Sequence, residues 1–570
     1  MHSKDAASSA SARPPKPSPE PPALPQACSP QDFADNTSRH LAHSEMMEIQ
    51  MMGKTSRAIA LAMASALVVA ACGGSTDSGG KGDGGGDVDK NGTLRFGFTV
   101  PAMPLDPHTT VTDTGQYAFV APLYDRLTQI TDGPKLEPML ATKWEFAPDG
   151  KSATFTLREG VTFSDGAELD AEAVKKSLDR ALTHPKTTAP TKLNMIESVE
   201  VVSPTEVKIS TKRPAADLPY TLAGSYGSII SPKALDNPDL DVKPVGSGPY
   251  VLKEIKLGES ATYTRREGYW DPKAQQAKTI VIRGIADDNA RLNALRSGQI
   301  DMMISKVGQA NQAKKLGENF GFHSYPAAAT YALQVNVDHE NLDQVKVRQA
   351  LNWAIDRDAI NDSLLNGQCR PNNQPLTQGF DGFLEDPPVA YDYDPAKAKT
   401  LLAEAGVSDG FKMQLLVGAG LSPQDKMAPV LQAQFKEIGV DAEIVEQDLA
   451  QASGNYSKSD FDSYLQTRVA GPSSAITLQK NFDNPATFPG TLPAEILESI
   501  NKGFDPSVEE ATALKALESA SAAINEQALD VFICALPTQV AYSDKVVGAD
   551  TMGQSYFQGI PDLRYVGIAD

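Results

Sequence analysis

Hydrophobic and polar positions alternate with two different periods along this chain. From Thr93 to Val100 apolar residues recur at every second position, which predicts a β-strand. After Asp170 the period changes to that of a helix, with Asp170 as the expected N-cap. The residues expected on its buried face are Ala173, Val174, Ser177, Leu178 and Ala181.

Two more helix patterns follow each other later in the chain. Asp394-Pro395 places a capping residue before a proline at the first helical position, and Gly406 marks the end. Ser422-Pro423 opens the next helix, which Gly439 ends, and residues 440–445 alternate as a strand. A strand–helix–strand succession of this kind predicts α/β layers.

Two turn dipeptides lie between strand-like runs in the first third of the chain. Asp149-Gly150 and Asp165-Gly166 combine a short carboxylate with a residue that tolerates positive φ. We interpret both as hairpin turns. Arg348 and Asp356, in a later helical segment, are interpreted as structural ion-pair partners.

Composition narrows the class of protein. A chain of 570 residues is too long for one hydrophobic core and predicts two or three domains. Hydrophobic residues make up 41% and charged residues 22%, as in ordinary soluble proteins. The net charge of −20 argues against nucleic acid as a partner, since phosphate binding needs clusters of basic residues.

One apolar run stands apart from the rest. Lys54 and Arg57 precede an aliphatic stretch from Ile59 to Ala71, which has the layout of a secretory signal. It is shorter than the roughly 20 residues that span a bilayer. Its end, Leu67 to Cys72, resembles the lipobox of bacterial lipoproteins, whose cysteine becomes the lipidated N-terminus. The resemblance predicts export and a lipid anchor on Cys72 at the outer face of the cytoplasmic membrane; a plain signal peptide or anchor helix is the alternative.

The segments around this signal carry no pattern of buried positions. Residues 1–50 include a Pro-, Ser- and Ala-rich stretch, so we interpret them as a disordered, non-native extension. The predicted signal occupies residues 51–72. Translation is expected to start at a methionine just before its basic residues, which is Met46, Met47, Met51 or Met52. Residues 73–90 are rich in glycine and serine and predict a flexible tether.

Two cysteines remain beyond the tether. Because an exported chain meets an oxidising environment, Cys369 and Cys534 either pair as a disulfide or stay as two buried thiols. Neither has a nearby Cys or His, so a zinc site is not expected.

Several segments, taken in order, resemble the family 5 extracellular solute-binding proteins, the dipeptide, oligopeptide and nickel binders of ATP-driven importers. Each motif is weak alone, but their order over nearly the whole mature chain is specific. They are Leu105-Asp106-Pro107, Leu123 to Leu127, Leu136 to Ala141 with Trp144, Asp149-Gly150, Thr154 to Arg158, Phe163 to Gly166, Gly246 to Tyr250, Tyr269-Trp270, Arg291 to Leu295 with Gly298 and Asp301, Val347 to Arg357, and Asp394 to Gly406.

The resemblance implies an α/β fold of the bilobal periplasmic-binding-protein type (type II, cluster C-like). Residues 91–133, 226–333 and 541–570 would form the main domain of the first lobe, with residues 134–225 as an extra inserted domain. Residues 334–540 would form the second lobe. These motifs identify the fold and not the ligand.

The implied function is capture of a small solute in the cleft between the lobes and its delivery to an ABC permease. The expected protein is a monomer and not an enzyme, and it needs no cofactor. A surface sensor or adhesion lipoprotein is the alternative. An exported hydrolase is disfavoured because the motifs G-x-S-x-G, H-E-x-x-H, C-x-x-C and the P-loop are absent.

Peptide-binding members of the family hold the ligand's α-amino group with an aspartate, and the corresponding place here falls at or near Gly471. A buried ammonium without a counter-charge is costly, so an ordinary peptide amine needs another acid in the cleft. Arg468 instead offers donors for a carboxylate or phosphate. Its alternative roles are a structural salt bridge or a solvent-facing position.

Other candidates for the cleft come from their positions in the family pattern, and core packing is the alternative for each tyrosine. Nickel is not supported, because His108, His184, His323 and His339 are scattered. For Met103, packing is favoured over metal ligation. The expected ligand-binding residues are Met103, Tyr117, Tyr226, Tyr331, Gln334, Tyr464, Thr467, Arg468 and Gly471.

Overall fold

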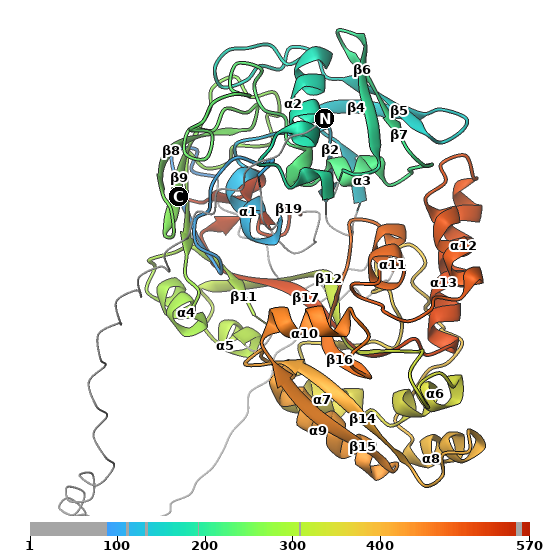
Figure 1. Ribbon diagram of the computed structural model, residues 1–570. Helices are drawn as coiled ribbons and strands as arrows, with labels where there is room; N and C mark the ends of the chain where they lie inside the picture. The colour runs from blue at the N-terminus through green and yellow to red at the C-terminus, as the bar shows by residue number, and fades with distance from the viewer. Residues whose placement is uncertain (1–87, 110–112, 132–134, 192, 307–308, 555–560) are drawn as a thin grey trace, which may run out of the picture. The chain divides into compact units, whose positions relative to one another are not determined.

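A computed structural model describes residues 88–109, 113–131, 135–191, 193–306, 309–554 and 561–570 (Figure 1). The predicted extension, the signal segment with Cys72, and the tether as far as residue 87 lie outside the described residues. Within the described part, no helix combines the length and the apolar character that crossing a membrane requires.

The largest sheet of the described chain has eleven strands, and its middle is built from strands far apart in sequence. Its order is β15 (Val440–Gln447), β14 (Phe411–Gly418), β16 (Ser463–Val469), β12 (Phe320–Val335), β17 (Asp530–Ser543), β11 (Met302–Ser305), β1 (Thr93–Phe98), β10 (Thr279–Gly284), β9 (Ser260–Arg265) and β8 (Tyr250–Lys256), with β13 (Arg370–Pro371) pairing to β17. Strand β1 runs parallel to both of its neighbours, β10 and β11. Strand β14 likewise runs parallel to β15 and β16.

Smaller sheets accompany the large one. Two have four strands, in the orders β20 (Pro561–Asp562), β19 (Gly553–Gln554), β2 (Thr128–Thr131), β3 (Lys135–Pro138), and β4 (Ala141–Phe146), β5 (Ser152–Leu157), β7 (Glu206–Thr211), β6 (Ile196–Ser203). A third pairs β18 (Val546–Val547) with β21 (Gly567–Ile568).

Helices occur throughout the described chain, and several short 3-10 turns lie between them. The α-helices are α1 (Asp113–Val120), α2 (Ala171–Thr183), α3 (Leu218–Leu222), α4 (Asp288–Arg296), α5 (Ala310–Lys314), α6 (Val345–Trp353), α7 (Arg357–Leu364), α8 (Pro395–Glu404), α9 (Gln424–Glu437), α10 (Leu449–Tyr456), α11 (Ser474–Phe482), α12 (Ala494–Gly503) and α13 (Glu510–Glu526). The 3-10 turns are η1 (Ala189–Thr191), η2 (Ser225–Gly227) and η4 (Leu563–Tyr565).

The helix starts predicted from capping residues are confirmed. The Asp170 side chain accepts from the backbone N–H of Ala173 at 2.8 Å, and the predicted face of α2 is buried. Asp394 accepts from the N–H of Lys397 in the same way at the start of α8. These contacts satisfy N–H groups that the first turn of a helix leaves without partners.

The second helix pattern is confirmed with a small shift. The helix α9 begins at Gln424 rather than at Pro423, and β15 follows it as predicted. Asp149-Gly150 forms the predicted turn between β4 and β5, where Gly150 has a φ of +67° and the Asp149 carboxylate accepts from the Lys151 N–H. Positive φ costs glycine little, which explains the residue choice.

The interpretation of Arg348 as an ion-pair partner is wrong. Its guanidinium is buried in α6 and donates to the backbone carbonyls of Leu342 and Gln527, at 2.7 and 2.8 Å. Asp356 caps α7 instead, accepting from the Ala359 N–H. Burial lowers the pKa of Arg348 to about 10. The residue therefore ties α6 to the segment after α13 through carbonyl oxygens.

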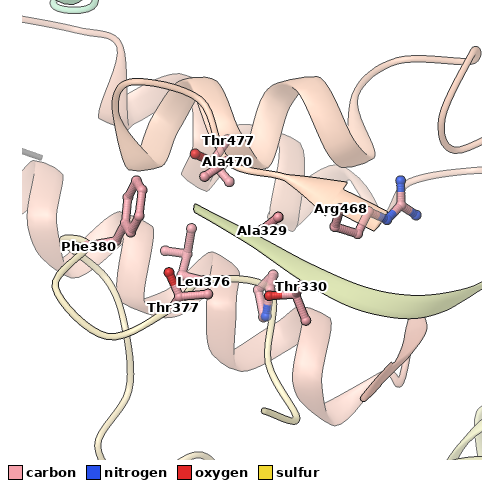
Figure 2. Close-up of a pocket in the computed structure, with 9 residues that line it drawn as sticks. Ala329, Thr330, Leu376, Thr377, Phe380, Arg468, Ala470 and Thr477 are labelled. Carbon is pink, nitrogen blue, oxygen red and sulfur yellow. The ribbon is translucent and has the colours of Figure 1, made fainter. Parts of the chain in front are cut away.

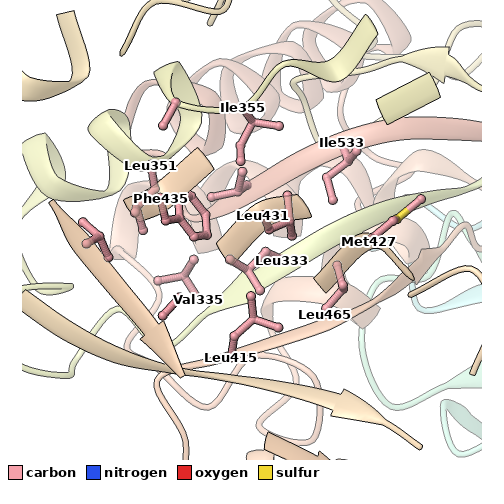
Figure 3. Close-up of a cluster of buried hydrophobic side chains, with 14 of the residues drawn as sticks. Leu333, Val335, Leu351, Ile355, Leu415, Met427, Leu431, Phe435, Leu465 and Ile533 are labelled. Atoms are coloured by element: carbon pink, nitrogen blue, oxygen red, sulfur yellow. The ribbon is translucent and has the colours of Figure 1, made fainter. Parts of the chain in front are cut away.

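A large hydrophobic core lies between the β14–β16–β12–β17 part of the sheet and helices that include α6 and α9 (Figure 3). Figure 3 shows side chains from separate strands and helices meeting in this core. Full burial of one such aliphatic side chain contributes about 1.5–3 kcal/mol. Labelled members are Leu333, Val335, Leu351, Ile355, Leu415, Met427, Leu431, Phe435, Leu465 and Ile533.

Strands β12 and β17 pair with each other along most of their length, but the register of the pairing is irregular in the middle. Their register shifts between Ser324 and Ala327 and again between Ala327 and Ala329. Pro326 lies in β12, and Pro537 lies opposite Ala327. A proline has no N–H to give to a ladder, which explains why the pairing is interrupted here.

Candidate functional site

The expected residues on β12 and β16 do not share one face of the sheet. Tyr331 lies opposite Thr467, and Gln334 lies opposite Tyr464. Opposed residues point to the same side, while residues three apart on one strand point to opposite sides. The structure therefore brings each pair together but separates the two pairs by the thickness of the sheet.

The first pair faces the hydrophobic core. Tyr331 is a member of the core cluster, and burial raises its pKa, so the phenol stays protonated. The Thr467 hydroxyl accepts a hydrogen bond from the Gln424 amide at 3.3 Å. For Tyr331 the structure favours the core packing that the sequence left open as the alternative.

Arg468 lies on the other face and forms a buried ion pair. Its Nε is 2.6 Å from Asp530 Oδ2, its Nη2 is 3.0 Å from Oδ1, and the Arg468 residue is only 3% exposed. Nη1 donates to the carbonyls of Asn481 and Thr487, each at 2.8 Å. The guanidinium is thus engaged by the protein itself. The structural salt bridge, and not recognition of an anionic ligand, is the role that this geometry supports.

A small pocket adjoins Arg468 on the same face (Figure 2). Its cavity volume is about 10 Å³, room for about one water molecule. Figure 2 shows threonine hydroxyls and the Phe380 ring around it. The lining residues are Ala329, Thr330, Pro375, Leu376, Thr377, Phe380, Arg468, Ala470 and Thr477.

The backbone next to this pocket explains why Gly471 is a glycine. A Cβ at Gly471 would lie 2.7 Å from Cγ2 of Ile476, closer than side chains tolerate. The Gly471 N–H donates to the Thr477 hydroxyl at 2.9 Å. An aspartate at this position would force Ile476 to move, so local packing disfavours the acid that is absent from the sequence.

The expected residues from the first part of the chain are mostly buried. Tyr117 is 1% exposed and Tyr226 is 7% exposed, whereas Met103 is half-buried. Tyr117 belongs to α1, which packs against η2, the turn that carries Tyr226. The guanidinium carbon of Arg126 lies 5.0 Å from the centre of the Tyr117 ring. In the sequence, Arg126 stands out only as one residue of the family motif from Leu123 to Leu127.

Residues before α3 contact the segment after α12. The Ala216 N–H donates to the Phe504 carbonyl at 2.9 Å, and the Arg213 guanidinium lies 4.4 Å from the Phe504 ring centre. Tyr220 packs against the hydrophobic cluster that includes Phe380. Residues of the predicted inserted domain therefore contact residues of the predicted second lobe.

Cys369 and Cys534 are joined by a disulfide bond with a Cα–Cα distance of 5.7 Å. Cys534 lies on β17 opposite Tyr331 of β12, so the bond anchors residue 369 to the middle of the large sheet. Among the residues that the structure describes, no three His, Cys, Asp or Glu side chains are grouped as metal ligands.

Comparison with known proteins decides the family. Residues 135–489 match the family described as bacterial extracellular solute-binding proteins, family 5 Middle. The chain belongs to the family 5 solute-binding proteins. The glutathione-binding protein GsiB of Salmonella paratyphi A is 32% identical over 362 residues, which cover 61% of this chain and 68% of GsiB.

Solved structures confirm the predicted α/β, periplasmic-binding-protein-like fold of this family 5 protein. HbpA2 from Haemophilus parasuis aligns with a TM-score of 0.75 and 24% identity, covering 84% of this chain and 99% of HbpA2. DppA from Helicobacter pylori, in complex with the peptide STSA, aligns with a TM-score of 0.68 and 24% identity, covering 84% and 98%. At these identities the likeness establishes the fold alone.

Proposed function

We propose that this chain is the lipid-anchored, extracytoplasmic binding protein of an ABC importer and that it captures a peptide-like solute for a membrane permease. Membership of the family 5 solute-binding proteins carries the proposal. The relation to a glutathione-binding protein supports a peptide-like ligand. The contacts of Ala216 and Arg213 with Phe504 support a ligand cleft between two lobes with the boundaries predicted above.

Binding is expected to change the population of conformations. A ligand that touches both lobes favours the state in which they are closed around it, and that state is the one a permease would recognise. The pocket beside Phe380 has a volume of about 10 Å³, which is too small for a peptide, so the residues that line it must move before a solute can enter. No covalent chemistry is needed for this role, which fits a binding protein rather than an enzyme.

The first prediction concerns the ligand. A thermal-shift and calorimetric screen should include glutathione, dipeptides, longer peptides, anionic sugars and metal chelates. Glutathione or another short peptide is expected to stabilise the protein, by about 2.7 kcal/mol at a ligand concentration of 100 Kd, because it binds only the folded state. Stabilisation by a sugar or chelate and by no peptide would contradict the peptide-like assignment.

The second prediction concerns the anchor. The purified protein is expected to enter the detergent phase in a cloud-point partition because acyl chains on Cys72 add about 0.8 kcal/mol per buried CH₂. The Cys72→Ser variant should move to the aqueous phase, whereas the neighbouring Ser75→Ala variant should not. Detergent partition of Cys72→Ser equal to that of the unmodified sequence would refute the lipid anchor.

A further inference from the structure

Arg126 is a buried arginine whose hydrogen-bonding capacity is largely unused. It lies just before β2, and its side chain is 1% exposed. Within the part of the chain that the structure describes, Nε and Nη1 have no hydrogen-bond partner. Burying guanidinium N–H groups without acceptors is costly, and native structures contain few such groups.

The carboxylate of Asp562 does not satisfy the hydrogen-bonding capacity of Arg126. Asp562 Oδ2 lies 3.4 Å from Nη2 of Arg126, beyond the usual range of an N–H···O bond. The same oxygen accepts from Arg564 Nε at 2.8 Å, which is the shorter and stronger contact. Asp562 therefore interacts with both arginines, and its contact with Arg126 is weaker than its contact with Arg564.

The second buried carboxylate of this cluster is also engaged elsewhere. Asp125 accepts from Arg564 at 3.0 Å, from the Tyr269 hydroxyl at 2.9 Å and from the Trp270 indole at 3.0 Å. Its fourth partner is the Ser247 hydroxyl. These bonds explain the Tyr269-Trp270 motif structurally, and they leave no Asp125 contact for Arg126.

Positive charge exceeds negative charge in this buried cluster. Arg126, Arg266 and Arg564 carry three positive charges against the two of Asp125 and Asp562. Arg266 is 9% exposed, and its Nε also lacks a partner within the described chain. Burial lowers the pKa of Arg266, and the negative charge of Asp125 partly opposes this shift. One more negative group would balance the cluster.

The position of Arg126 connects this cluster with the expected ligand cleft. Its guanidinium carbon is 5.0 Å from the ring centre of Tyr117, one of the residues expected in the cleft. A contact with an aromatic ring stabilises the cation but supplies no acceptor in place of a hydrogen bond. The unused N–H groups thus lie next to a predicted cleft residue.

We infer that Arg126 forms an anion subsite in the first lobe and takes a carboxylate of the solute; this rests on the proposed function. The planar guanidinium matches a planar carboxylate, and one bound carboxylate would cancel the surplus charge. Arg468, which the sequence offered as one candidate for this task, is paired with Asp530. Phosphate shares the same recognition chemistry and is a separate arm of the test.

The test compares glutathione with its C-terminal carboxamide by calorimetry on the purified full chain. The original sequence should prefer the acid by about 10- to 100-fold, the range expected for hydrogen bonds to a charged group. Arg126→Gln should reduce this preference to less than about threefold while affinity for the amide stays similar. Arg180→Gln, which replaces a buried arginine paired with Asp106 outside this cluster, is the matched control and should keep most of the preference.

A second variant and two small anions serve as additional tests of the Arg126 subsite. Arg126→Lys retains the charge and gives an intermediate preference if Arg126→Gln does not fold. Acetate and inorganic phosphate are tested separately in thermal shifts, where acetate should stabilise the original sequence and not Arg126→Gln. If no peptide binds but this acetate effect is seen, the proposed function fails and the subsite stands.

Three results overturn the subsite. One is an acid preference unchanged in Arg126→Gln, and another is acetate stabilisation that persists in that variant. The third is peptide binding with no preference for the acid. Stabilisation by phosphate alone assigns the site to phosphate and refutes the carboxylate.

Discussion

Replacing Asp530 with alanine is expected to destabilise the protein by about 3–5 kcal/mol, because it leaves the Arg468 guanidinium buried without its counter-charge. Asp530 is 1% exposed and Arg468 is 3% exposed. Water therefore cannot replace the lost carboxylate. Urea unfolding followed by circular dichroism measures the loss, and Arg468→Ala should cost a similar amount.

A double replacement separates two effects on stability: leaving Arg468 without its partner, and losing the whole ion pair. Arg468→Met with Asp530→Leu removes both charges and keeps apolar volume beside Phe482, whose ring centre is 5.0 Å from the guanidinium carbon. Such swaps are often neutral or stabilising, so the double variant should be more stable than Asp530→Ala. Equal losses in all three variants would contradict this account.

The pKa of Asp530 gives the sign of its pH dependence. Burial raises this pKa above its usual value, and the ion pair with Arg468 only partly opposes the shift. A carboxyl whose folded pKa exceeds the unfolded one loses stabilising effect as pH rises through that interval. The contribution of Asp530 to stability is therefore expected to fall as pH rises through that interval.

Removing the disulfide is the second large effect that we expect. Cys369→Ala with Cys534→Ala should lower the free energy of unfolding by about 2–5 kcal/mol. The bond closes a loop with a sequence separation of 165 residues, so its absence enlarges the conformational freedom of the unfolded chain. Thermal and urea unfolding under non-reducing conditions measure the difference.

Reduction provides the control for the disulfide. Dithiothreitol should lower the stability of the original sequence toward that of the double alanine variant and leave the variant unchanged. Ligand binding should change little at a temperature where both proteins are folded. A stability of the variant equal to that of the oxidised original sequence would show that the bond contributes nothing.

Much of the local structure was predictable because short segments determine it. Asp170 and Asp394 each lie next to the helix that they cap, so the capping contact spans only a few residues. Gly150 takes a positive φ for a reason visible in the Asp-Gly dipeptide itself. The family pattern added the fold because many such segments occur in one order.

The candidate site was less predictable because it depends on contacts across the fold. Tyr331 and Gln334 were grouped as cleft residues, but their spacing on one strand sends them to opposite faces of the sheet. The role of Arg468 depends on Asp530, which lies 62 positions later in the chain. No local sequence pattern predicts that Asp530 is the partner of Arg468.

The sequence by itself determined the α/β succession, the helix caps, the turns and, through ordered motifs, the family. These properties arise from neighbouring residues and from periodicity along one segment. Only the tertiary structure decided that Arg468 is an internal counter-ion and that Arg126 is left with unused donors. The physical reason is that both outcomes depend on which carboxylates reach each guanidinium once strands from distant parts of the chain have packed together.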